Sequence, residues 1–253
     1  MSTLKGNVAI VTAGAGAGIG QAVAKRFLEA GADVVLTDAH ARRVQETGEA
    51  LAKEFGREVL ALEVDVRNAA QINAMVEAAL AKYGQIDILF NNAGINRLQP
   101  IWEMDEENWA TVLDVSLTGT FRCLRAVLPH MIERKSGAIV SMASTAGWGA
   151  PGDGEAHYCA AKAGVMALTR AAAAEVGRFG IRVNAIAPSV IYNEFLERIY
   201  PKEMFERMEK ANPLGRLGQP RDVADLALFL VSDMSSYITG EVVCISGGVV
   251  MHA

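Results

Sequence analysis

The chain has little cysteine, few aromatic residues and no long apolar run. Its 253 residues include three cysteines, and aromatic side chains make up 6% of the sequence. Cys123, Cys159 and Cys244 lie far apart and form no Cys-x-x-Cys motif, which argues against a disulfide framework and favours a reducing compartment. No uninterrupted apolar stretch reaches the roughly 18 residues that a membrane-spanning helix needs. We therefore expect a cytoplasmic protein with no membrane partner.

An excess of positive charge and a cluster of histidines are also lacking. The formal net charge is −5, which argues against nucleic acid or an anionic membrane surface as a main partner. Asp153, Glu155 and His157 alternate, as in some metal sites, but no second histidine or cysteine lies at ligand spacing, so we expect no bound metal. The apolar run from Val8 to Ala13 is too short for a signal peptide, and we assign it to a first strand.

Short apolar runs alternate with helical patterns over nearly the whole chain. The early runs are apolar on both faces, which is typical of a parallel sheet covered by helices on both sides. The expected strands are Val8–Thr12, Asp33–Thr37, Val59–Val64, Ile86–Phe90, Ala138–Met142, Ile181–Ile186 and Val242–Ile245. Helical patterns include Gln21–Ala30, Ala69–Tyr83 and Arg221–Val231.

This alternation predicts an α/β fold with a doubly wound, Rossmann-like parallel sheet of seven strands and helices on both faces. Nothing marks a linker, so we expect one domain over residues 1–253. With 51% hydrophobic and 21% charged residues, the chain can build a sizeable core. Ligands of such sheets bind at the carboxyl ends of the strands.

A glycine-rich stretch separates the first expected strand from the first helix. It reads Ala13-Gly14-Ala15-Gly16-Ala17-Gly18-Ile19-Gly20. Strand, glycine loop and helix are the context of a dinucleotide fingerprint: glycines let the backbone approach a pyrophosphate, and the helix N-terminus offers unpaired N–H groups. The alternative is a mobile Ala/Gly linker. A linker is disfavoured because the stretch lies between an expected strand and the start of an expected helix. We expect Gly14, Gly18, Ile19 and Gly20 to bind the cofactor.

The second expected strand leads directly into an acid. Asp38 follows Gly14 by 24 residues, close to the spacing at which a carboxylate meets the ribose hydroxyls of a dinucleotide. A carboxylate repels a 2′-phosphate, so the sequence favours NAD over NADP. Arg42 and Arg43 lie nearby and weaken this preference, although their spacing favours the exposed face of the next helix.

Ser144, Tyr158 and Lys162 form a candidate acid–base set. Tyr158 and Lys162 stand four residues apart in a helical pattern, about one turn, so both side chains share a face. A nearby cation favours phenolate and is expected to bring the pKa of Tyr158 down from about 10. Ser144 follows an expected strand, where its hydroxyl can hold a substrate oxygen. Alone, Tyr-x-x-x-Lys is usually a solvated pair; the glycine loop gives it weight.

Several marks in order make the chain resemble the short-chain dehydrogenase/reductase family over essentially its whole length. They include Gly14-x-x-x-Gly18-x-Gly20, Asp65-Val66, Asn91-Asn92-Ala93-Gly94, Ser144, Tyr158-x-x-x-Lys162, Pro188, Pro220-Arg221-Asp222-Val223-Ala224 and Gly247-Gly248. Within the family, segments such as Ala156-His157-Tyr158 and Pro188-Ser189-Val190 resemble a bacterial branch acting on sterol-degradation acyl-CoA intermediates.

The resemblance implies a role for each matching residue. Tyr158 is then the general acid/base, Lys162 binds the nicotinamide ribose and lowers the pKa of the tyrosine, and Ser144 orients the substrate. Ser116 stands where the family has a catalytic asparagine that holds a water. The implied cofactor-binding residues are Gly14, Gly18, Ile19, Gly20, Asp38, Asp65, Val66, Asn92, Tyr158, Lys162 and Ile191.

Two departures from the family pattern bear on the site. Ala13 is an extra residue between Thr12 and Gly14, so the loop must absorb one residue. Ser116 has a shorter reach than asparagine, which leaves the proton exit route open.

An apolar segment at about 190–212 is expected to form a small helical lid. Its large residues at roughly helical spacing are Phe195, Leu196, Ile199, Tyr200, Met204 and Phe205. They suit either a lid packed on the core or an apolar wall for a bulky substrate. The resemblance also implies a homotetramer, for which the apolar C-terminus and the alanine-rich stretch 160–174 are suited.

We expect an NAD-dependent oxidoreductase that acts on a secondary alcohol or ketone of a bulky apolar substrate. Steroid-like molecules and 3-hydroxyacyl- or 3-oxoacyl-CoA thioesters are the candidates. An NADP-dependent 3-oxoacyl thioester reductase is one alternative. A non-catalytic nucleotide-sensing or scaffold protein is another, because a fold alone does not fix function.

Overall fold

One parallel sheet organises the computed structural model, which describes residues 3–149, 154–193, 196 and 202–251. Its seven strands lie in the order β3-β2-β1-β4-β5-β6-β7, and each neighbouring pair is parallel. The strands are β1 (Val8–Val11), β2 (Asp33–Asp38), β3 (Val59–Glu63), β4 (Ile88–Asn91), β5 (Gly137–Met142), β6 (Ile181–Pro188) and β7 (Val242–Ile245). The predicted doubly wound α/β fold is confirmed.

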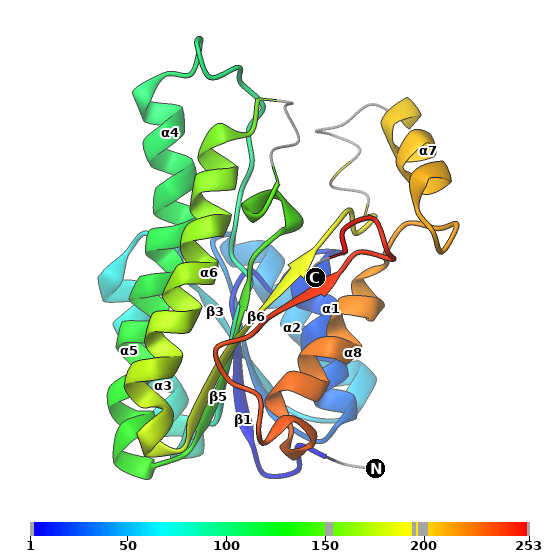
Figure 1. Ribbon diagram of the computed structural model, residues 1–253. Helices are drawn as coiled ribbons and strands as arrows, with labels where there is room; N and C mark the ends of the chain where they lie inside the picture. The colour runs from blue at the N-terminus through cyan, green and yellow to red at the C-terminus, as the bar shows by residue number, and fades with distance from the viewer. Residues whose placement is uncertain (1–2, 150–153, 194–195, 197–201, 252–253) are drawn as a thin grey trace.

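Helices cover the sheet on both faces (Figure 1). They are α1 (Ile19–Glu29), α2 (Ala41–Phe55), α3 (Ala69–Tyr83), α4 (Glu106–Leu113), α5 (Gly119–Arg134), α6 (Ala156–Val176), α7 (Lys202–Ala211) and α8 (Pro220–Val231). Helices α1, α2 and α8 pack on one face and α3, α5 and α6 on the other. Within the described residues, none of these helices combines the length and apolarity needed to cross a membrane.

Each face of the sheet has its own apolar core. Phe27 of α1 and Phe90 of β4 meet edge to face in one core, with ring centroids 6.3 Å apart. Ile10 of β1 and Met131 of α5 belong to the other core and are fully buried. Successive residues of β1 and β4 therefore point into different cores, which explains their uninterrupted apolar sequence.

The predicted element bounds differ from the structure mainly at strand ends. Helix α3 spans the predicted residues, since the side chain of Asn68 caps its start and Gly84 ends it with a positive φ of 74°. The first strand ends at Val11 because the backbone of Thr12 turns toward the Asn92 side chain. The fourth begins at Ile88, because the backbone N–H of Ile86 donates to His130 instead of a strand.

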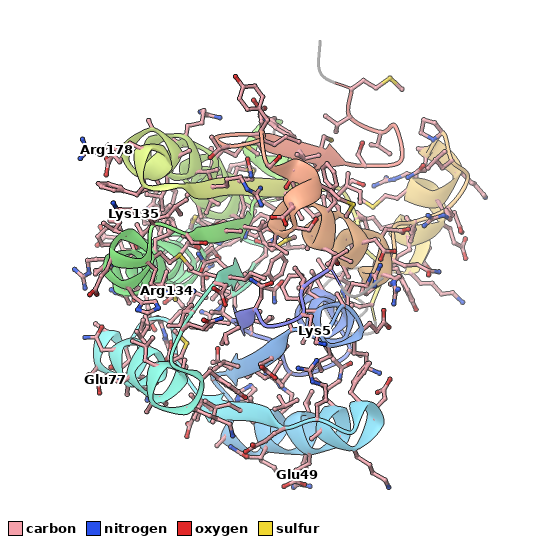
Figure 2. The ribbon with its side chains drawn as sticks, turned by 90° about the horizontal axis from the view of Figure 1, so that it is seen from below. Lys5, Glu49, Glu77, Arg134, Lys135 and Arg178 are labelled. Carbon is pink, nitrogen blue, oxygen red and sulfur yellow. The ribbon has the colours of Figure 1, made fainter. Side chains whose placement is uncertain are left out.

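The two ends of the sheet have different surroundings. Figure 2 looks at the molecule from below, where Lys5, Arg134, Lys135 and Arg178 are labelled near the amino ends of the strands. The carboxyl ends point toward the top of Figure 1, where helix α7 stands apart from the sheet. The glycine loop and the segments after β4 and β5 all leave from these carboxyl ends, so the fold brings them together.

Candidate active site

The glycine loop joins β1 to α1 at the carboxyl edge of the sheet. The backbone N–H of Gly14 donates to Thr37 of β2 at 2.8 Å, which ties the loop to the neighbouring strand. A Cβ at Gly20 would lie 2.3 Å from the carbonyl oxygen of Ala13, so only glycine fits. Gly18 is the N-cap of α1, and no side chain caps this helix start. The first N–H groups of α1, from Ile19 on, are therefore available to an anion.

The extra residue of this loop adopts an uncommon backbone conformation. Ala13 has a φ of 48°, in the left-handed region that favours glycine. Its carbonyl oxygen accepts a hydrogen bond of 3.0 Å from the Asn92 side chain. The loop thus absorbs its additional residue as a local kink at Ala13, which Asn92 holds in place.

Asp38 ends β2 and is 3% exposed. Its Oδ1 accepts hydrogen bonds from the Arg43 guanidinium at 2.6 Å and from the backbone N–H of His40 at 3.1 Å. Arg42 has the exposed position predicted for it, with a side chain 91% exposed beside Glu46. Arg43 is also exposed, as predicted, with a side chain 45% accessible, and its guanidinium in addition reaches back to Asp38.

Asp65 and Val66 follow β3, one strand further from the glycine loop. Asp65 pairs with Arg67 at 2.6 Å, and this hydrogen bond lowers the pKa of the carboxyl. Val66 is buried, and Gly119 of α5 packs so closely that a Cβ there would lie 2.6 Å from the Val66 side chain. The two residues share the carboxyl edge of the sheet with the glycine loop but do not line its cavity.

Asn92 follows β4 and links the segment after this strand to the glycine loop. Its backbone N–H donates to Thr12 Oγ1 at 2.9 Å, and its Nδ2 donates to the carbonyls of Thr12 and Ala13 at 3.2 and 3.0 Å. Asn92 is predicted to touch the cofactor. The structure shows that Asn92 fixes the loop which would carry the pyrophosphate.

Ser116 lies in a π-helical turn, Asp114–Thr118, between α4 and α5. It is fully buried. Its Oγ accepts from the N–H of Ile95 at 3.1 Å and donates to the carbonyl of the same residue at 3.2 Å. The single hydroxyl proton is therefore engaged, and Ser116 fixes the chain after Gly94. A Cβ at Gly94 would lie 3.2 Å from Lys162 Nζ and 3.6 Å from Ser116 Oγ, so both reach the same point.

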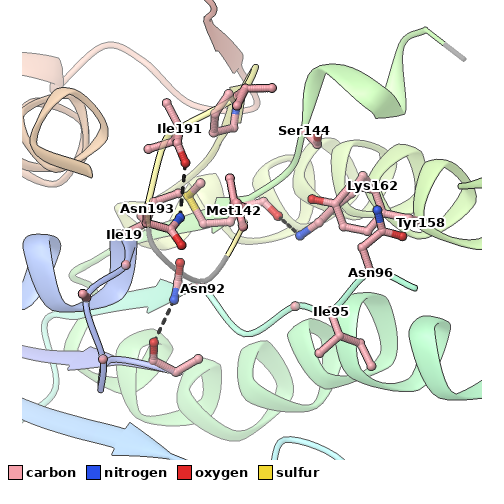
Figure 3. Close-up of a pocket in the computed structure, with 18 of the residues that line it drawn as sticks. Ile19, Asn92, Ile95, Asn96, Met142, Ser144, Tyr158, Lys162, Ile191 and Asn193 are labelled. Atoms are coloured by element: carbon pink, nitrogen blue, oxygen red, sulfur yellow. Dashed lines mark hydrogen bonds between the residues drawn. The ribbon is translucent and has the colours of Figure 1, made fainter. Parts of the chain in front are cut away.

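Ser144, Tyr158 and Lys162 come from two neighbouring segments. Ser144 is the N-cap of the short helical turn after β5, and its Oγ accepts from the N–H of Ala146 at 3.2 Å. Tyr158 and Lys162 lie one turn apart on α6, with Lys162 Nζ 5.5 Å from the centre of the tyrosine ring. The ammonium donates to the carbonyl of Met142 at 2.6 Å, which ties α6 to the end of β5 (Figure 3).

Burial dominates the protonation of this set. It raises the pKa of Tyr158 to about 12, against a hydrogen bond with Ser144 that lowers this pKa. It also lowers the pKa of Lys162 to about 8. The prediction that Lys162 lowers the pKa of Tyr158 toward neutrality is therefore wrong. Desolvation, which favours the neutral phenol, is the largest of the effects on this pKa, so Tyr158 is protonated at neutral pH.

A cavity of about 570 Å³ lies along the carboxyl edge between these groups. It brings together the predicted residues Gly18, Ile19, Asp38, Asn92, Ser144, Tyr158, Lys162 and Ile191. The predicted residues Gly14, Gly20, Asp65, Val66 and Ser116 lie outside its wall and support it from behind or beside. Lining residues that the sequence did not single out include Asn96, Met142 and Ala143.

The segment after β6 forms another wall of the cavity. Ile191 is 5% exposed, and its carbonyl accepts from Asn193 Nδ2 at 3.2 Å (Figure 3). Leu196 also lines the cavity, whereas Phe205 of α7 is buried against Tyr192, with ring centroids 5.7 Å apart. The expected lid segment thus contributes to the cavity wall through Leu196 and to packing through Phe205. Phe195, Ile199 and Tyr200, also named for the lid, lie outside the described residues.

The acidic and histidine residues upstream of Tyr158 form no metal cluster in the described part of the chain. His157 is fully buried, and its Nδ1 accepts from the N–H of Tyr158 at 2.8 Å. Asp153 lies outside the described residues.

Almost the whole chain matches known proteins. A family model described as enoyl-(acyl carrier protein) reductase covers residues 14–250. A protein of Mycobacterium tuberculosis, (5R,7aS)-5-hydroxy-7a-methyl-1-oxo-2,3,5,6,7,7a-hexahydro-1H-indene-carboxyl-CoA reductase, is 44% identical over 245 residues, which is 96% of this chain and 93% of that protein. The 3-oxoacyl-(acyl-carrier-protein) reductase FabG of Thermotoga maritima is 41% identical, covering 98% of this chain and 99% of the relative.

A solved structure shares the fold at similar identity. The crystal structure of a short chain dehydrogenase from Mycobacterium smegmatis superposes with a TM-score of 0.87 at 41% identity, covering 100% of this chain and 95% of that one. Family model, relatives and solved structure agree on the family. The chain belongs to the short-chain dehydrogenase/reductase family of oxidoreductases.

Proposed function

We propose that the protein transfers a hydride between NAD(H) and a secondary alcohol or ketone carried by a bulky apolar substrate. One observation carries this proposal: Ser144, Tyr158 and Lys162 line the same cavity as Gly18 and Asp38. A dinucleotide laid from Asp38 past the glycine loop would place its far end beside the tyrosine. Ser116 would support this set through its contacts with Ile95 rather than by touching the substrate.

The cavity suits a dinucleotide along its length. The start of α1 is uncapped, and a Cβ at Gly18 would meet nothing within 4 Å, so the backbone is open to a pyrophosphate. Gly94 leaves Lys162 Nζ accessible from the cavity, because a side chain there would lie against the ammonium. Gly14, Gly20, Asp65 and Val66 would shape this binding site, with Asn92 and Ile191 at its walls. The nicotinamide ring, when bound, supplies or accepts the hydride.

The chain's own residues handle the proton. In reduction of a ketone, the phenol of Tyr158 donates its proton to the carbonyl oxygen as the hydride reaches the carbon, leaving a phenolate. In oxidation of the alcohol, that phenolate takes the hydroxyl proton as the hydride departs. The pKa of about 12 keeps Tyr158 in its donating form at neutral pH. Ser144 holds the substrate oxygen, and Lys162 stabilises the phenolate by its charge.

Asp38 supports NAD as the cofactor. Its buried carboxylate stands at the end of β2, where it would accept hydrogen bonds from the ribose hydroxyls and repel a 2′-phosphate. Arg43 favours the alternative, since its guanidinium lines the cavity and a 2′-phosphate would compete with Asp38 for it. We favour NAD because the 2.6 Å ion pair already commits Arg43 to Asp38.

The substrate side of the proposal rests on the cavity wall and on the relatives. Ile95, Val190 and Leu196 make part of the wall apolar, which suits a bulky apolar group. The mycobacterial relative is named for a CoA-linked substrate, and the Thermotoga relative for a 3-oxoacyl thioester of a carrier protein. We infer that this protein acts on a hydroxy or keto acyl thioester, with a CoA thioester as the leading candidate.

We also propose that residues 1–253 form one dinucleotide-binding catalytic domain, with about 190–212 as a substrate lid. All seven strands, from β1 to β7 along the chain, belong to a single sheet, which supports this division. Three cysteines with free thiols support a reducing, cytoplasmic setting.

The direct test measures hydride transfer between NADH or NADPH and a panel of bulky ketones and 3-oxoacyl-CoA thioesters. We expect turnover of at least one thioester. The value of kcat/KM should be at least about tenfold higher for NADH, because NADPH loses a ribose hydroxyl contact with Asp38 and brings a 2′-phosphate that this carboxylate repels. A preference for NADPH would contradict the cofactor assignment. Absence of turnover over the whole panel, with cofactor still bound, would favour a sensing or scaffold protein.

A further inference from the structure

The helix that carries the tyrosine starts without a capping side chain at its N-cap. The N-cap residue is Glu155, whose carboxylate bonds Nδ2 of Asn96 at 2.6 Å and, among the described residues, makes no capping hydrogen bond with α6. The first N–H groups of a helix have no carbonyl partner within it, and an N-cap side chain normally accepts from one of them. The N–H of Tyr158 is such a group, so another acceptor has to serve it.

His157 supplies this acceptor from within the first turn of α6. Its Nδ1 lies 2.8 Å from the backbone nitrogen of Tyr158 and accepts that N–H. The next N–H, that of Cys159, donates to the carbonyl of Glu155 at 2.8 Å and begins the regular helical pattern. The imidazole thus satisfies the last N–H that the helix itself leaves without a partner, and this N–H belongs to the tyrosine of the active site.

The protonation of His157 follows from this contact and from burial. A ring nitrogen that accepts a hydrogen bond carries no proton, so the neutral imidazole has its proton on Nε2. The side chain is fully buried. Burial lowers the pKa of His157 from its ordinary 6.5 more than the backbone of Arg97 and the charge of Glu155 raise it, and the charge of Arg97 lowers it further. His157 is therefore neutral at pH 7 and takes up its second proton below pH 6.5.

Other segments packed on α6 also bring charged groups to this region. They are the segment 95–99, helix α4 and the π-helical turn after α4. Arg97 keeps its charge over the whole range of mild acid, and the backbone N–H of Asn108 lowers the pKa of Asp105. Histidine is the side chain whose ordinary pKa lies between pH 5 and 8, so His157 is the group here that changes charge in mild acid. The charged residues of these segments are Arg97, Asp105, Glu106, Glu107 and Asp114.

Protonation converts the acceptor of this contact into a donor. An imidazolium carries a hydrogen on both nitrogens, so Nδ1–H would point at the N–H of Tyr158. Two donors cannot bond, and the backbone N–H is then left unsatisfied or has to move. The side chain of Tyr158 lines the cavity beside Lys162 (Figure 3). A displacement of about 1 Å in such a group is enough to slow a reaction strongly.

We propose that His157 is a positioning residue whose neutral imidazole holds the backbone of Tyr158 in place, and that its protonation releases the tyrosine, so that turnover falls in mild acid. This inference rests on the proposed function, in which Tyr158 exchanges the proton. Reduction of a ketone uses the protonated phenol, which acid does not remove. A loss of reductive turnover in mild acid therefore reports a group other than Tyr158.

The test measures kcat for reduction of the best thioester substrate at saturating NADH between pH 7.5 and pH 5. Wild-type kcat should fall at least about threefold toward pH 5. His157→Asn should abolish this fall, because asparagine places Oδ1 where Nδ1 lies and does not titrate. His157→Phe fills the same space without an acceptor, so its kcat should be at least about threefold lower than that of the wild type at pH 7.5 and should not fall further.

His130→Gln is the matched control. His130 also accepts a backbone N–H, that of Ile86 at 3.2 Å, but it lies near the amino end of β4, so this variant should keep the fall. A wild-type kcat that stays level down to pH 5 overturns the inference even if neither His157 variant folds. A fall that persists in His157→Asn, with a thermal melt like that of the wild type, belongs to another group and overturns it as well.

Amide signals of the tyrosines separate this inference from the proposed function. The chain has five tyrosines, so ¹⁵N-tyrosine labelling gives a short list of backbone signals, and Tyr158→Phe identifies that of Tyr158 by its loss. This signal should shift between pH 7.5 and pH 5 in the wild type and stay in place in His157→Asn. If the protein transfers no hydride, the proposed function fails, and the shift still supports the contact between His157 and Tyr158. A wild-type signal that does not move overturns the inference.

Discussion

Lys162 is 3% exposed and donates to the carbonyl of Met142 at 2.6 Å. Its ammonium has lost most of its water, which lowers its pKa to about 8 from an ordinary value of 10.5. At neutral pH most molecules still carry the charge. The residue that stabilises the phenolate in the proposed reaction is therefore held in the protein at a cost in stability.

This cost makes the free energy of unfolding depend on pH. Between about pH 8 and about pH 10 the unfolded chain keeps a proton on Lys162 that the folded protein has released, so stability due to this residue rises with pH. The expected rise in the free energy of unfolding is about 2 kcal/mol, because the pKa of Lys162 lies roughly two to three pH units lower in the folded protein than in the unfolded chain.

Urea denaturation of the wild type and of Lys162→Met over this pH range checks the prediction. The methionine variant lacks the titrating group. Both proteins keep the tyrosines whose pKa is about 12, so their contribution cancels in the difference between the two free energies of unfolding. A wild-type stability that stays parallel to that of the variant would show that the ammonium is not desolvated.

At the scale of elements, the glycine loop contains a strained backbone conformation at Ala13, which a substitution can test. Ala13 has a φ of 48°, and no other described residue of the loop except Gly16 has a positive φ. A left-handed backbone conformation costs a non-glycine residue roughly 1–2 kcal/mol. Glycine avoids this cost, but it loses more chain entropy on folding, which offsets part of the gain. Ala13→Gly should therefore raise the free energy of unfolding by about 0.5–1 kcal/mol.

Ala15→Gly is the matched control in the same loop. Ala15 has an ordinary φ, so glycine there adds only chain entropy to the unfolded state and should lower stability by about 0.5–1 kcal/mol. Thermal melts of the two variants should move in opposite directions. Two melts that move downward together would mean that the extra residue is accommodated elsewhere in the loop.

The elements also show where sequence pattern is informative. Apolar runs predict all seven strands, because each strand contributes to a core on both faces of the sheet. Helix α3 is bounded correctly because Asn68 and Gly84 are local signals. The π-helical turn that contains Ser116 has no such signal; its place depends on the contact with Ile95 from another connection.

Contacts between distant segments explain what the sequence did not reveal in the site. The pair of Asn96 and Glu155 joins residues 59 positions apart, and no local motif indicates that the two residues meet. Arg43 has the exposed position that its spacing past the helix start predicts, but this spacing does not describe its ion pair with Asp38. The pKa of Tyr158 depends on burial, which a spacing of four residues does not describe.

At the scale of the whole molecule, we expect a homotetramer. Trp109 of α4 and Phe121 of α5 are 40% and 43% exposed. On α6, Ala167, Ala171 and Ala174 form an exposed stripe of small residues that permits close approach of another helix. These three helices lie on the same face of the sheet in Figure 1 and would form an interface between copies.

Light scattering should give a mass about four times the 27.0 kDa of one chain. Phe121→Glu places a charge in the proposed interface and should yield a smaller assembly. Arg42→Glu, at a position 91% exposed on α2, should leave the mass unchanged. A wild-type monomer over the micromolar range would contradict the expected assembly.

The central claim is that the phenol of Tyr158 exchanges a proton with the substrate oxygen while a nucleotide bound beside Asp38 exchanges a hydride. The most direct measurement is the turnover of Tyr158→Phe together with its affinity for NADH. We predict that kcat falls by about 10²–10⁴, the usual contribution of a general acid or base, while NADH binds with nearly the wild-type affinity. Turnover near that of the wild type would contradict the account, because the phenyl ring keeps the shape of the site but has no proton to give.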